Sequence, residues 1–517
     1  MDAQIPLQDL LHTNCLPTDI QRPYARNFVE KSTSKLSEVD ADLAGSIAET
    51  TRLRLERDAI SADLQRHEML LSPARRLLSI PELIGEICLH CILDPTDQVI
   101  TRNSFLLPSP YNYSCGMRDD PLTLSHVCRV WRRVALPTPR LWASFRLFAD
   151  QRSIVPVNER LSRSQSHPLS FAIQLRSYDM SIQDSPVIAA LAKHQNRWKY
   201  VFVNGTGSIK DFLSSVSDTY PVLEKLHLSI EAISLRGNHR CLDTAIAAPN
   251  LIQLELKGCV LISDKLSLPN LRVLIIYDSS KTTSWDYCLS MCRLHPTLEK
   301  AMFHISPTTT ISSDENIVVL PSLKALHLSI TFAHASVPPD ASPLLVKIRA
   351  PALKKLLIRS ESGVTQSIQE SILPFLKRSS ATLASFYLDG NYSDMGSLTE
   401  FLEHLPHLQE LSLSSRHLNS DDLLTHLRKP IFKHTPNVLC APELAVIGPI
   451  WSNPTLASMV DFIVSRSSNV TGALREVVVK SRQSADELRS HPGISECIKK
   501  GLQVIFRKSP TCSSSGY

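Results

Sequence analysis

A phrase of apolar positions returns many times in the C-terminal two thirds of the chain. It reads proline, any residue, leucine, two residues, leucine, one residue, leucine or isoleucine. It stands in full at Pro221–Leu228, Pro249–Leu256, Pro269–Ile276 and Pro321–Leu328. Further copies open at Pro351, Pro406 and Pro442, and weaker ones begin at Trp198, Leu298, Leu383 and Leu474. The first leucine recurs at intervals of roughly 20 to 36 residues, which is the length of one supersecondary unit.

The last two leucines of each phrase alternate with another residue, so they share one face of a short strand. Proline cannot donate to a sheet and marks where each strand begins. Asp421–Leu427 suits a covering helix, and Gly501–Phe506 alternates like a final strand. The phrase and period resemble leucine-rich repeats, with Cys259 and Asn391 at the Asn/Cys position. We therefore predict a curved, right-handed leucine-rich-repeat solenoid over residues 160–507, with about eleven strands and outer helices.

The residue between the two leucines points to the opposite face of its strand. His227 and His327 occupy this position, so we expect them on the concave face of the sheet. There they serve either as contacts for a partner or as ordinary polar residues of a solvated face.

One long helix is predicted over residues 31–71, about 60 Å in length. Its apolar residues follow a heptad stripe, although Ser46, Thr50 and Arg57 interrupt it. Two interpretations stay open: a coiled-coil dimerisation arm, or a helix that packs on its own protein, which the interruptions favour. Residues 1–30 are expected to be flexible. The stripe consists of Leu36, Val39, Leu43, Leu53, Ile60, Leu64 and Leu71.

Shorter helices follow. Pro81 suits a first helical position, and Leu83, Ile84 and Ile87 continue an apolar stripe until Asp94-Pro95. Residues 95–120 are polar and rich in proline, and are expected to form a loop. A short helix around Leu122–Val127 and another carrying Val130, Trp131 and Val134 come next, with Arg129, Arg132 and Arg133 outside the apolar face.

Composition and net charge argue against several classes of function. Of 517 residues, 43% are hydrophobic and 20% charged, which is globular. The net charge of +5 is too small to imply nucleic acid as the main partner, and 15 glycines are few for nucleotide-binding loops. No apolar run could span a membrane and no signal-peptide pattern opens the chain, so a cytoplasmic or nuclear location is expected.

Candidate catalytic and metal-binding patterns are weak. The chain has no GxSxG, HExxH or Walker A phrase, and Asn204–Ser208 looks like a turn. Twelve cysteines are scattered, and neither Cys88-x-His90-Cys91 nor Cys288 with Cys292 has the spacing of a complete metal site. We expect buried thiols, no metal, no cofactor and no enzymatic activity.

Three segments carry a family resemblance. Pro81-Glu82-Leu83-Ile84 with Glu86-Ile87 resembles the first helix of an F-box, and Val127–Arg132 resembles its V-C-[KR]-x-W-[RK] helix. Thr138–Trp142 resembles the T-P-x-L-W segment that often follows. Together with the long helix and Leu71–Arg76, this pattern is similar to a large group of fungal F-box proteins. The F-box domain would cover residues 73–147 with a loop insertion at 95–120, and residues 508–517 would be a flexible tail.

The chain departs from the family pattern at Ile80, where leucine is usual, at Cys88, where phenylalanine is usual, and in the loop of roughly 25 residues. The resemblance implies a non-catalytic substrate-recognition subunit of a Skp1–cullin–F-box (SCF) ubiquitin ligase. It implies binding to a Skp1-like adaptor, through it to a cullin, and to an unidentified protein substrate destined for ubiquitin-dependent degradation. The alternative is a leucine-rich-repeat scaffold without ligase association. The residues predicted to face or support Skp1 are Ile80, Pro81, Leu83, Ile84, Ile87, Leu124, Val127, Val130 and Trp131.

Overall fold

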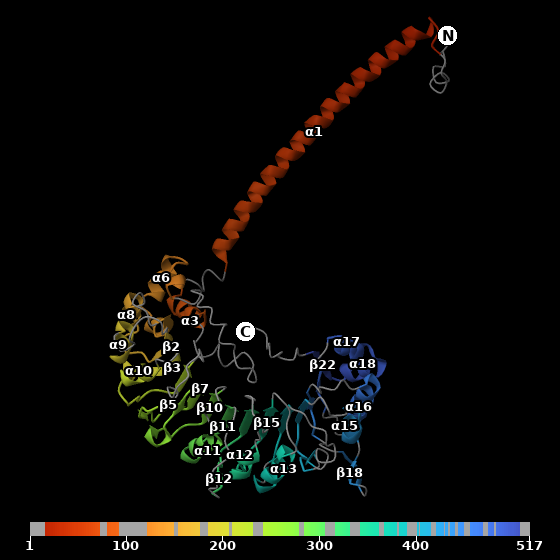
Figure 1. Cartoon of the computed structure of the whole chain (residues 1–517). Coiled ribbons are helices and arrows are strands. Elements are labelled where there is room, and N and C mark those ends of the chain that lie inside the picture. The colour runs from red at the N-terminus through yellow and green to blue at the C-terminus, as the bar shows by residue number, and fades with distance from the viewer. Residues whose placement is uncertain are drawn as a thin grey trace. The chain divides into compact units, whose positions relative to one another are not determined.

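The protein is mixed α/β, with a long N-terminal helix followed by a large parallel sheet with helices (Figure 1). Its chain divides into two compact units, Met1–Glu86 and Ile87–Tyr517. The computed structural model describes residues 16–72, 80–91, 121–148, 154–175, 185–205, 209–230, 241–278, 284–305, 316–330, 342–360, 367–379, 382–389, 401–402, 404–414, 420–428, 430–432, 435–439, 443–448, 455–468, 474–479 and 482–506. The predicted loop 95–120, Asn391, Arg507 and the predicted tail 508–517 lie outside these residues.

The first unit is dominated by helix α1, Gln21–Leu71, which is 51 residues long. The long helix is confirmed and ends at the predicted residue, but it begins ten residues before residue 31. The expectation that residues 21–30 are flexible was therefore wrong, because Gln21–Glu30 continue the helix. None of its residues is buried, and each apolar residue of the predicted stripe is more than half exposed.

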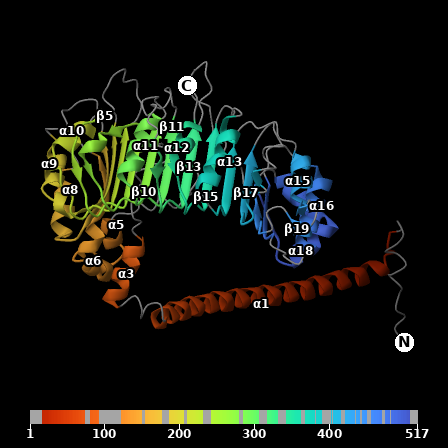
Figure 2. The same cartoon turned by 90° about the horizontal axis from the view of Figure 1, so that it is seen from below.

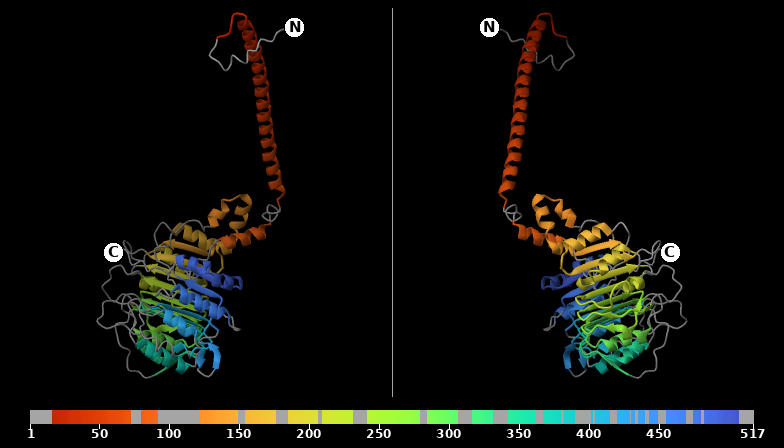
Figure 3. Two further views of the ribbon diagram at one scale, coloured as in Figure 1. Left: turned by 90° about the vertical axis from the view of Figure 1, so that its right-hand side faces the viewer. Right: turned by 90° about the vertical axis from the view of Figure 1, so that its left-hand side faces the viewer.

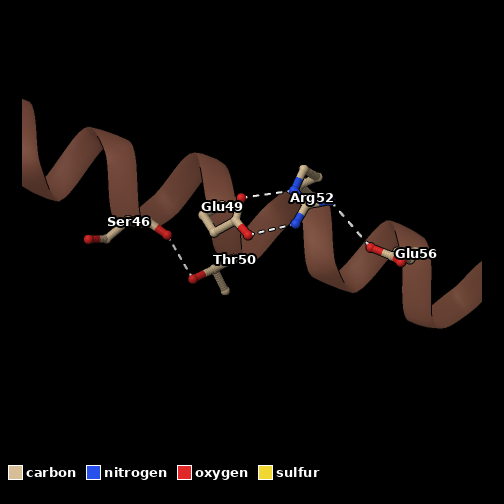
Figure 4. Close-up of polar contacts among 5 residues, drawn as sticks. All are labelled: Ser46, Glu49, Thr50, Arg52 and Glu56. Atoms are coloured by element: carbon tan, nitrogen blue, oxygen red, sulfur yellow. Dashed lines mark hydrogen bonds and ion pairs between the residues drawn. The ribbon is translucent and has the colours of Figure 1, made fainter.

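Polar side chains of α1 satisfy one another along the helix (Figure 4). The guanidinium of Arg52 donates to both carboxylate oxygens of Glu49, at 2.8 and 2.7 Å, and reaches Glu56 at 3.4 Å. The hydroxyl of Thr50 donates to the carbonyl of Ser46 at 2.8 Å. Because this hydroxyl is bonded within its own helix, Thr50 can enter an apolar seam without an unpaired donor.

The two interpretations of α1 differ in oligomeric state. If the stripe is a dimer seam, the intact chain is a dimer and Leu43→Lys with Leu64→Lys is a monomer in light scattering, whereas the interrupted stripe favours a monomer whose helix packs on its own protein. The matched control, Ala41→Lys with Ala62→Lys, adds the same charges on the side of the helix opposite the stripe and should leave the dimer intact. A wild-type chain that is monomeric at tens of micromolar would exclude the coiled-coil arm.

Four short helices stand where the sequence predicts the F-box segments. Helix α3, Pro81–Cys91, begins at the predicted proline and contains the boundary between the two units. Helices α5, Pro121–Ser125, and α6, Arg129–Ala135, pack together within the second unit. Helix α7, Pro139–Trp142, adds one turn within the segment that resembles T-P-x-L-W.

The second unit is built on one 14-stranded sheet in which every neighbouring pair is parallel (Figure 2). The strands follow one another in chain order. They are β1 Ser144–Phe148, β2 Leu169–Leu175, β3 Trp198–Gly205, β4 Lys225–Ile230, β7 Gln253–Lys257, β10 Val273–Asp278, β11 Lys300–Ile305, β13 Ala325–Ile330, β15 Lys355–Ser360, β16 Ser385–Asp389, β17 Glu410–Ser414, β20 Val446–Ile447, β21 Glu476–Val479 and β22 Gln503–Phe506.

The prediction of about eleven strands was too low. The eleven phrases correspond to β3 through β21, and the expected final strand is β22. The two strands that were missed, β1 and β2, alternate apolar and polar residues but lack the proline–leucine phrase. The sheet therefore begins at Ser144, before residue 160.

The phrase sets a constant register across the sheet. Leu226 pairs with Leu254 and Leu254 with Leu274, and Leu326 and Leu411 lie further along the same row. Backbone N–H groups of one repeat also bind a carbonyl of the repeat before it: the carbonyl of Lys324 accepts from Lys354 and Lys355, both at 2.9 Å. Consecutive repeats are thus joined both by buried leucines and by backbone hydrogen bonds.

The strands follow a curve in the second unit, with helices on its outer side (Figures 1 and 3). The predicted helix at Asp421–Leu427 is confirmed as α15, Ser420–Arg428. The expectation of helices throughout was only partly right, because short strand pairs and the 3₁₀ turn η7, Ser263–Lys265, follow β4 and β7. The other helices are α8 Ile154–Arg163, α9 Pro186–Ala192, η6 Gln195–Arg197 (3₁₀), α10 Ile209–Ser214, α11 Trp285–Leu294, α12 Ser342–Lys347, α13 Ser367–Ser379, α16 Leu456–Ser468, α17 Arg482–Ser490 and α18 Pro492–Lys499. The short pairs are β5 Cys241–Leu242 with β8 Val260–Leu261, β6 Ile246–Ala247 with β9 Leu266–Ser267, β12 Val318–Val319 with β14 Ile348–Arg349, and antiparallel β18 Pro430–Phe432 with β19 Thr435–Leu439.

Arginines on the helical side join neighbouring repeats. Arg378 of α13 donates to the carbonyls of Leu345 and Ile348, at 2.6 and 3.0 Å, and Arg466 of α16 donates to the carbonyl of Leu427 at 2.6 Å. These carbonyls belong to the end of the preceding helix or the residue just after it, where backbone acceptors lack a partner within the helix. A charged donor satisfies them at the layer boundary, so each contact fixes the spacing between two repeats.

Cys259 lies three residues after the last leucine of its phrase and is buried, with its thiol 3.6 Å from the carbonyl of Leu228 on the neighbouring strand β4. The residue before it, Gly258, has a φ of +67°, and a Cβ there would lie 2.6 Å from the carbonyl oxygen of Ile230. Glycine is required at this turn because the backbone conformation and the close approach both exclude a side chain.

Leu326→Ala should lower the free energy of unfolding by about 2–5 kcal/mol, because Leu326 is fully enclosed in the leucine row. The neighbouring Lys324→Ala, on an exposed side chain, should change it by less than about 0.5 kcal/mol. Urea denaturation followed by circular dichroism measures both. Equal effects of the two substitutions would show that the leucine row is not the core of the sheet.

Candidate functional site

Helix α3 carries two apolar stripes. Ile84 and Cys88, four residues apart, are fully buried, whereas Leu83 and Ile87, also four residues apart, are exposed. Residues at this spacing lie above one another on a helix, so one stripe faces the interior and the other faces solvent. Ile80, just before the helix, extends the exposed stripe.

The buried stripe contains Cys88, one departure from the motif that the chain resembles, and it limits one predicted contact. Cys88 lies on the interior side, where burial raises the pKa of its thiol, so it is not part of the exposed stripe. Ile84 is fully buried, so it can pack beneath the exposed residues but cannot contact a partner directly.

Helices α5 and α6 also expose apolar side chains. Leu122, Val127 and Val130 are exposed, and Leu124 and Trp131 are half-buried. At five of the predicted positions, the exposed fraction of the side chain runs from 38% to 58%, which is high for hydrophobic residues. These positions are Ile80, Leu83, Ile87, Val127 and Val130. The same short helix α6 carries three exposed arginines, Arg129, Arg132 and Arg133.

The predicted docking residues fall on both sides of the unit boundary. Ile80, Pro81, Leu83 and Ile84 belong to the first unit, and Pro81 is exposed. Within the second unit, α5 packs on α6, with Leu124 on α5, Val130 and Trp131 on α6 and Val127 in the turn between them. The predicted residues of the second unit are Ile87, followed by these four, Leu124, Val127, Val130 and Trp131.

Trp142 anchors α6 to the sheet. Its indole N–H donates to the carbonyl of Ala135 at 3.0 Å, and the Arg163 guanidinium lies 4.7 Å from its ring centroid. Trp142 is fully enclosed, whereas Trp131, predicted to face or support Skp1, is half-buried.

The signal that could have identified Trp142 is a repeated spacing. Trp198, at the start of β3, donates to the carbonyl of Leu191 at 3.2 Å, and this carbonyl also lies seven residues earlier in the chain. Both tryptophans therefore close a helix–turn segment against the beginning of a strand.

A second candidate surface is the face of the sheet opposite the buried leucines. The residues between the two leucines form one row across neighbouring strands, as predicted for His227 and His327. The row consists of Phe202, His227, Glu255, Ile275, Met302, His327, Leu357 and Tyr387.

Side chains of this row are packed on one another. The His227 ring stacks on Phe202 with centroids 3.9 Å apart, and its Nδ1 lies 3.0 Å from Oε2 of Glu255. Burial raises the pKa of the Glu255 carboxyl, but His227, Lys257 and Lys300 outweigh it, so the net pKa lies below the ordinary value. Glu255 therefore stays ionised on a largely desolvated part of the face.

A hollow of about 150 Å³ opens beside His327. Lys300 and Lys355 occupy the same register on either side of Ala325, so a short side chain separates two long cationic ones. The hollow has room for roughly one side chain, and its lining is largely apolar apart from the two lysines and His327. The remaining lining residues are Ala301, Met302, Leu326, His327 and Leu357.

The environment of the hollow holds His327 neutral. Burial, followed by the charges of His304, Lys300, Arg359 and Lys355, lowers the pKa of His327 to about 3. Burial and Lys300 also lower the pKa of Lys355, against the opposing effect of Glu410. At neutral pH, the positive charge at the hollow therefore comes from the lysines.

Among the described residues, no group of three or more His, Cys, Asp or Glu side chains could hold a metal ion. Cys288 and Cys292 are both buried free thiols of α11, and burial raises the pKa of Cys292 to about 12. Across the same described ranges, no helix is long and apolar enough to cross a membrane.

The wild-type chain should lose more stability on acidification than His327→Gln. The folded-state pKa of His327, about 3, lies below the ordinary 6.5. As the pH falls through 6.5 towards 3, the imidazole is protonated in the unfolded chain but not in the folded chain, and this difference destabilises the folded state. Between pH 7.5 and 5 this difference amounts to at most about 2 kcal/mol. Urea titrations at both pH values measure it; identical pH dependence in the two proteins would show that His327 is not held neutral.

Comparison with known proteins names no family. The chain matches no model of a known protein family and no curated protein.

Proposed function

We propose that the chain is the substrate-recognition subunit of an SCF-type ubiquitin ligase. Helices α3, α5 and α6 act as the F-box that docks on a Skp1-like adaptor and, through it, on a cullin. The parallel sheet with its outer helices is a right-handed leucine-rich-repeat solenoid whose exposed strand face binds a protein substrate. The chain itself performs no chemistry, and it works in the cytosol or nucleus.

The observation that carries the proposal is the exposure of Ile80, Leu83, Ile87, Val127 and Val130 at positions where the family motif places partner contacts. Single exposed apolar side chains are common on protein surfaces, but a set that coincides with a docking motif indicates an interaction site. Covering them stabilises a complex by about 25 cal/mol per Å² of apolar surface, before the cost of association is subtracted.

The exposed arginines of α6 are suited to a partner whose surface is acidic. Arg129, Arg132 and Arg133 are exposed on α6 beside Val130. Such arginines steer association and add an attraction that salt weakens. The Skp1 surface that the family resemblance implies is acidic, which matches this charge.

Trp142 gives the proposed receptor its rigidity. Because the indole ties the end of α6 to the turn that enters β1, the docking helices of the second unit are fixed to the first strand of the sheet. A substrate held on the strand face would then keep a defined distance from the ligase core, as ubiquitin transfer requires.

Leu83→Asp and Val130→Asp should each weaken capture of purified Skp1 by the intact chain by at least tenfold. A charge is tolerated on the free surface but is strongly unfavourable in a dry interface. The control is Val155→Asp, which places the same charge on an exposed valine of α8, outside the motif. Ile84→Asp is unsuitable, because a buried aspartate would disturb the fold itself.

Circular dichroism should show the same spectrum for all three variants. Skp1 binding by wild type and Val155→Asp, with loss in the other two, supports the ligase subunit. Undiminished binding in Leu83→Asp and Val130→Asp, or no binding by the folded wild type, would remove it and leave the scaffold alternative.

A further inference from the structure

Charged residues flank the apolar stripe of α1 on both sides. The stripe consists of two series that repeat every seven residues, one from Leu36 and one from Val39. In a coiled coil, the residue before each member of the Leu36 series and the residue after each member of the Val39 series lie beside the seam and set the partner and its direction. The first flank consists of Lys35, Asp42, Glu49, Glu56 and Asp63, and the second flank of Asp40, Ile47, Arg54, Ser61 and Glu68.

Some charges of α1 are balanced within the helix, whereas three flank residues are not. Arg52, which lies outside both flanks, donates to the two carboxylate oxygens of Glu49 (Figure 4). Among the residues that the structure describes, Lys35, Asp40 and Arg54 form no ion pair. These three side chains are therefore available to a second helix.

A parallel pair of α1 helices in equal register brings these side chains to opposite charges. Each residue of the first flank then faces the residue of the second flank that lies five positions later on the other helix. Lys35 faces Asp40, and Glu49 faces Arg54, each of them twice because the pair is symmetric. Every apolar residue of the stripe also faces its own equivalent, so the apolar layers are retained in full.

An antiparallel pair matches less well, because it sets the first flank against itself. This flank is acidic apart from Lys35, which can meet only one of the four acidic residues. Reversal also disturbs the apolar layers: with Leu43 opposite Leu53, for example, Leu64 faces Ser32. The parallel pair has one repulsive contact of its own, between the Asp63 and Glu68 positions, and Arg66 binds Asp63 at 2.8 Å within the same helix.

The interruptions of the stripe favour a monomer when they are counted alone, but in equal register they are confined to three layers. The Thr50 hydroxyl donates to the carbonyl of Ser46 at 2.8 Å, so this layer holds no unpaired threonine donor. The Arg57 guanidinium binds Asp58 at 2.6 Å, outside the stripe and its flanks. Its aliphatic stem can therefore cover the seam while its charge stays in water.

We propose that α1 binds the α1 helix of a second copy of this chain, parallel and in equal register, with ion pairs between Lys35 and Asp40 and between Arg54 and Glu49. Each α1 ends at Leu71, so both second units follow the same end of the coiled coil. In a clause that rests on the proposed function, the pair carries two Skp1-docking surfaces and two strand faces. A substrate with two recognition sites is then held more tightly than by one copy.

Charge reversal on the intact chain tests this pairing. Lys35→Glu and Asp40→Lys each turn two attractive contacts into repulsive ones and break no contact within the helix. Each variant alone should therefore dimerise at least fivefold more weakly than the wild type in sedimentation equilibrium. An equimolar mixture of the two restores opposite charges at both contacts, and it should recover the wild-type dissociation constant within about threefold.

Lys31→Glu and Glu38→Lys are the matched controls. They make the same changes of charge on α1 but lie outside the stripe and both flanks, and the described part of the chain gives neither residue an ion pair. Each should leave the dissociation constant within about twofold of the wild type. Circular dichroism should show equal helix content in all four variants.

Three results would overturn the pairing. A wild-type chain that is monomeric at tens of micromolar has no seam, and equal weakening in the controls would show a response to net charge alone. A dimer that charge reversal leaves unchanged, or that the mixture fails to restore, would show that Lys35 and Asp40 do not face each other, as in an antiparallel pair. Skp1 capture depends on residues outside α1 and should be equal in all variants, which separates this failure from failure of the ligase proposal.

Discussion

No repeat of this protein can bury its leucines alone, and the structure depends on that constraint. Leu226, Leu254, Leu274 and Leu326 are enclosed only because neighbouring strands bring equivalent residues to the same register. A shift of one residue in any strand would turn its leucines to the open face and its polar residues inward. The hydrophobic gain therefore fixes register as well as stability, and the backbone hydrogen bonds and arginine contacts follow from it.

The same register creates the candidate binding surface. Since the leucine rows are aligned, the residues between and beside them are aligned as well, on the opposite face. Lys300 and Lys355 occupy one register on either side of Ala325 although 55 residues separate them in the chain, and the same alignment brings His227 to Glu255. The chemistry of this face is thus decided by which side chains the repeats carry at two positions, while the leucines keep the scaffold constant.

Much of the fold could be predicted from the sequence because its signals are local and repeated. The phrase located the strands from β3 to β21, and a heptad stripe located α1. Strands β1 and β2 were missed because alternation over a few residues, without the proline and first leucine, does not distinguish a strand from a loop. The extension of α1 to Gln21 was missed because residues 21–30 lack the stripe.

The site was harder to predict, because burial and proximity depend on neighbours far away in the chain. The stripe of α3 shows that Leu83, Ile84 and Ile87 are apolar, but only the packed structure separates buried Ile84 from its exposed neighbours. Trp131 and Trp142 look alike in the sequence, and the hydrogen bond to the Ala135 carbonyl distinguishes the second. The lysine pair could have been found from the sequence by aligning the equivalent positions of successive phrases, because Lys300 and Lys355 occupy the same position of their phrases.

The central claim is that one surface docks the ligase core while another is left open for substrate. Hydrogen–deuterium exchange of the intact chain with and without purified Skp1 tests this directly. The account predicts added protection in residues 80–91 and 121–135, with none in the strands that form the His327 hollow. Protection confined to β11, β13 and β15, or no added protection at the helices despite binding, would contradict it.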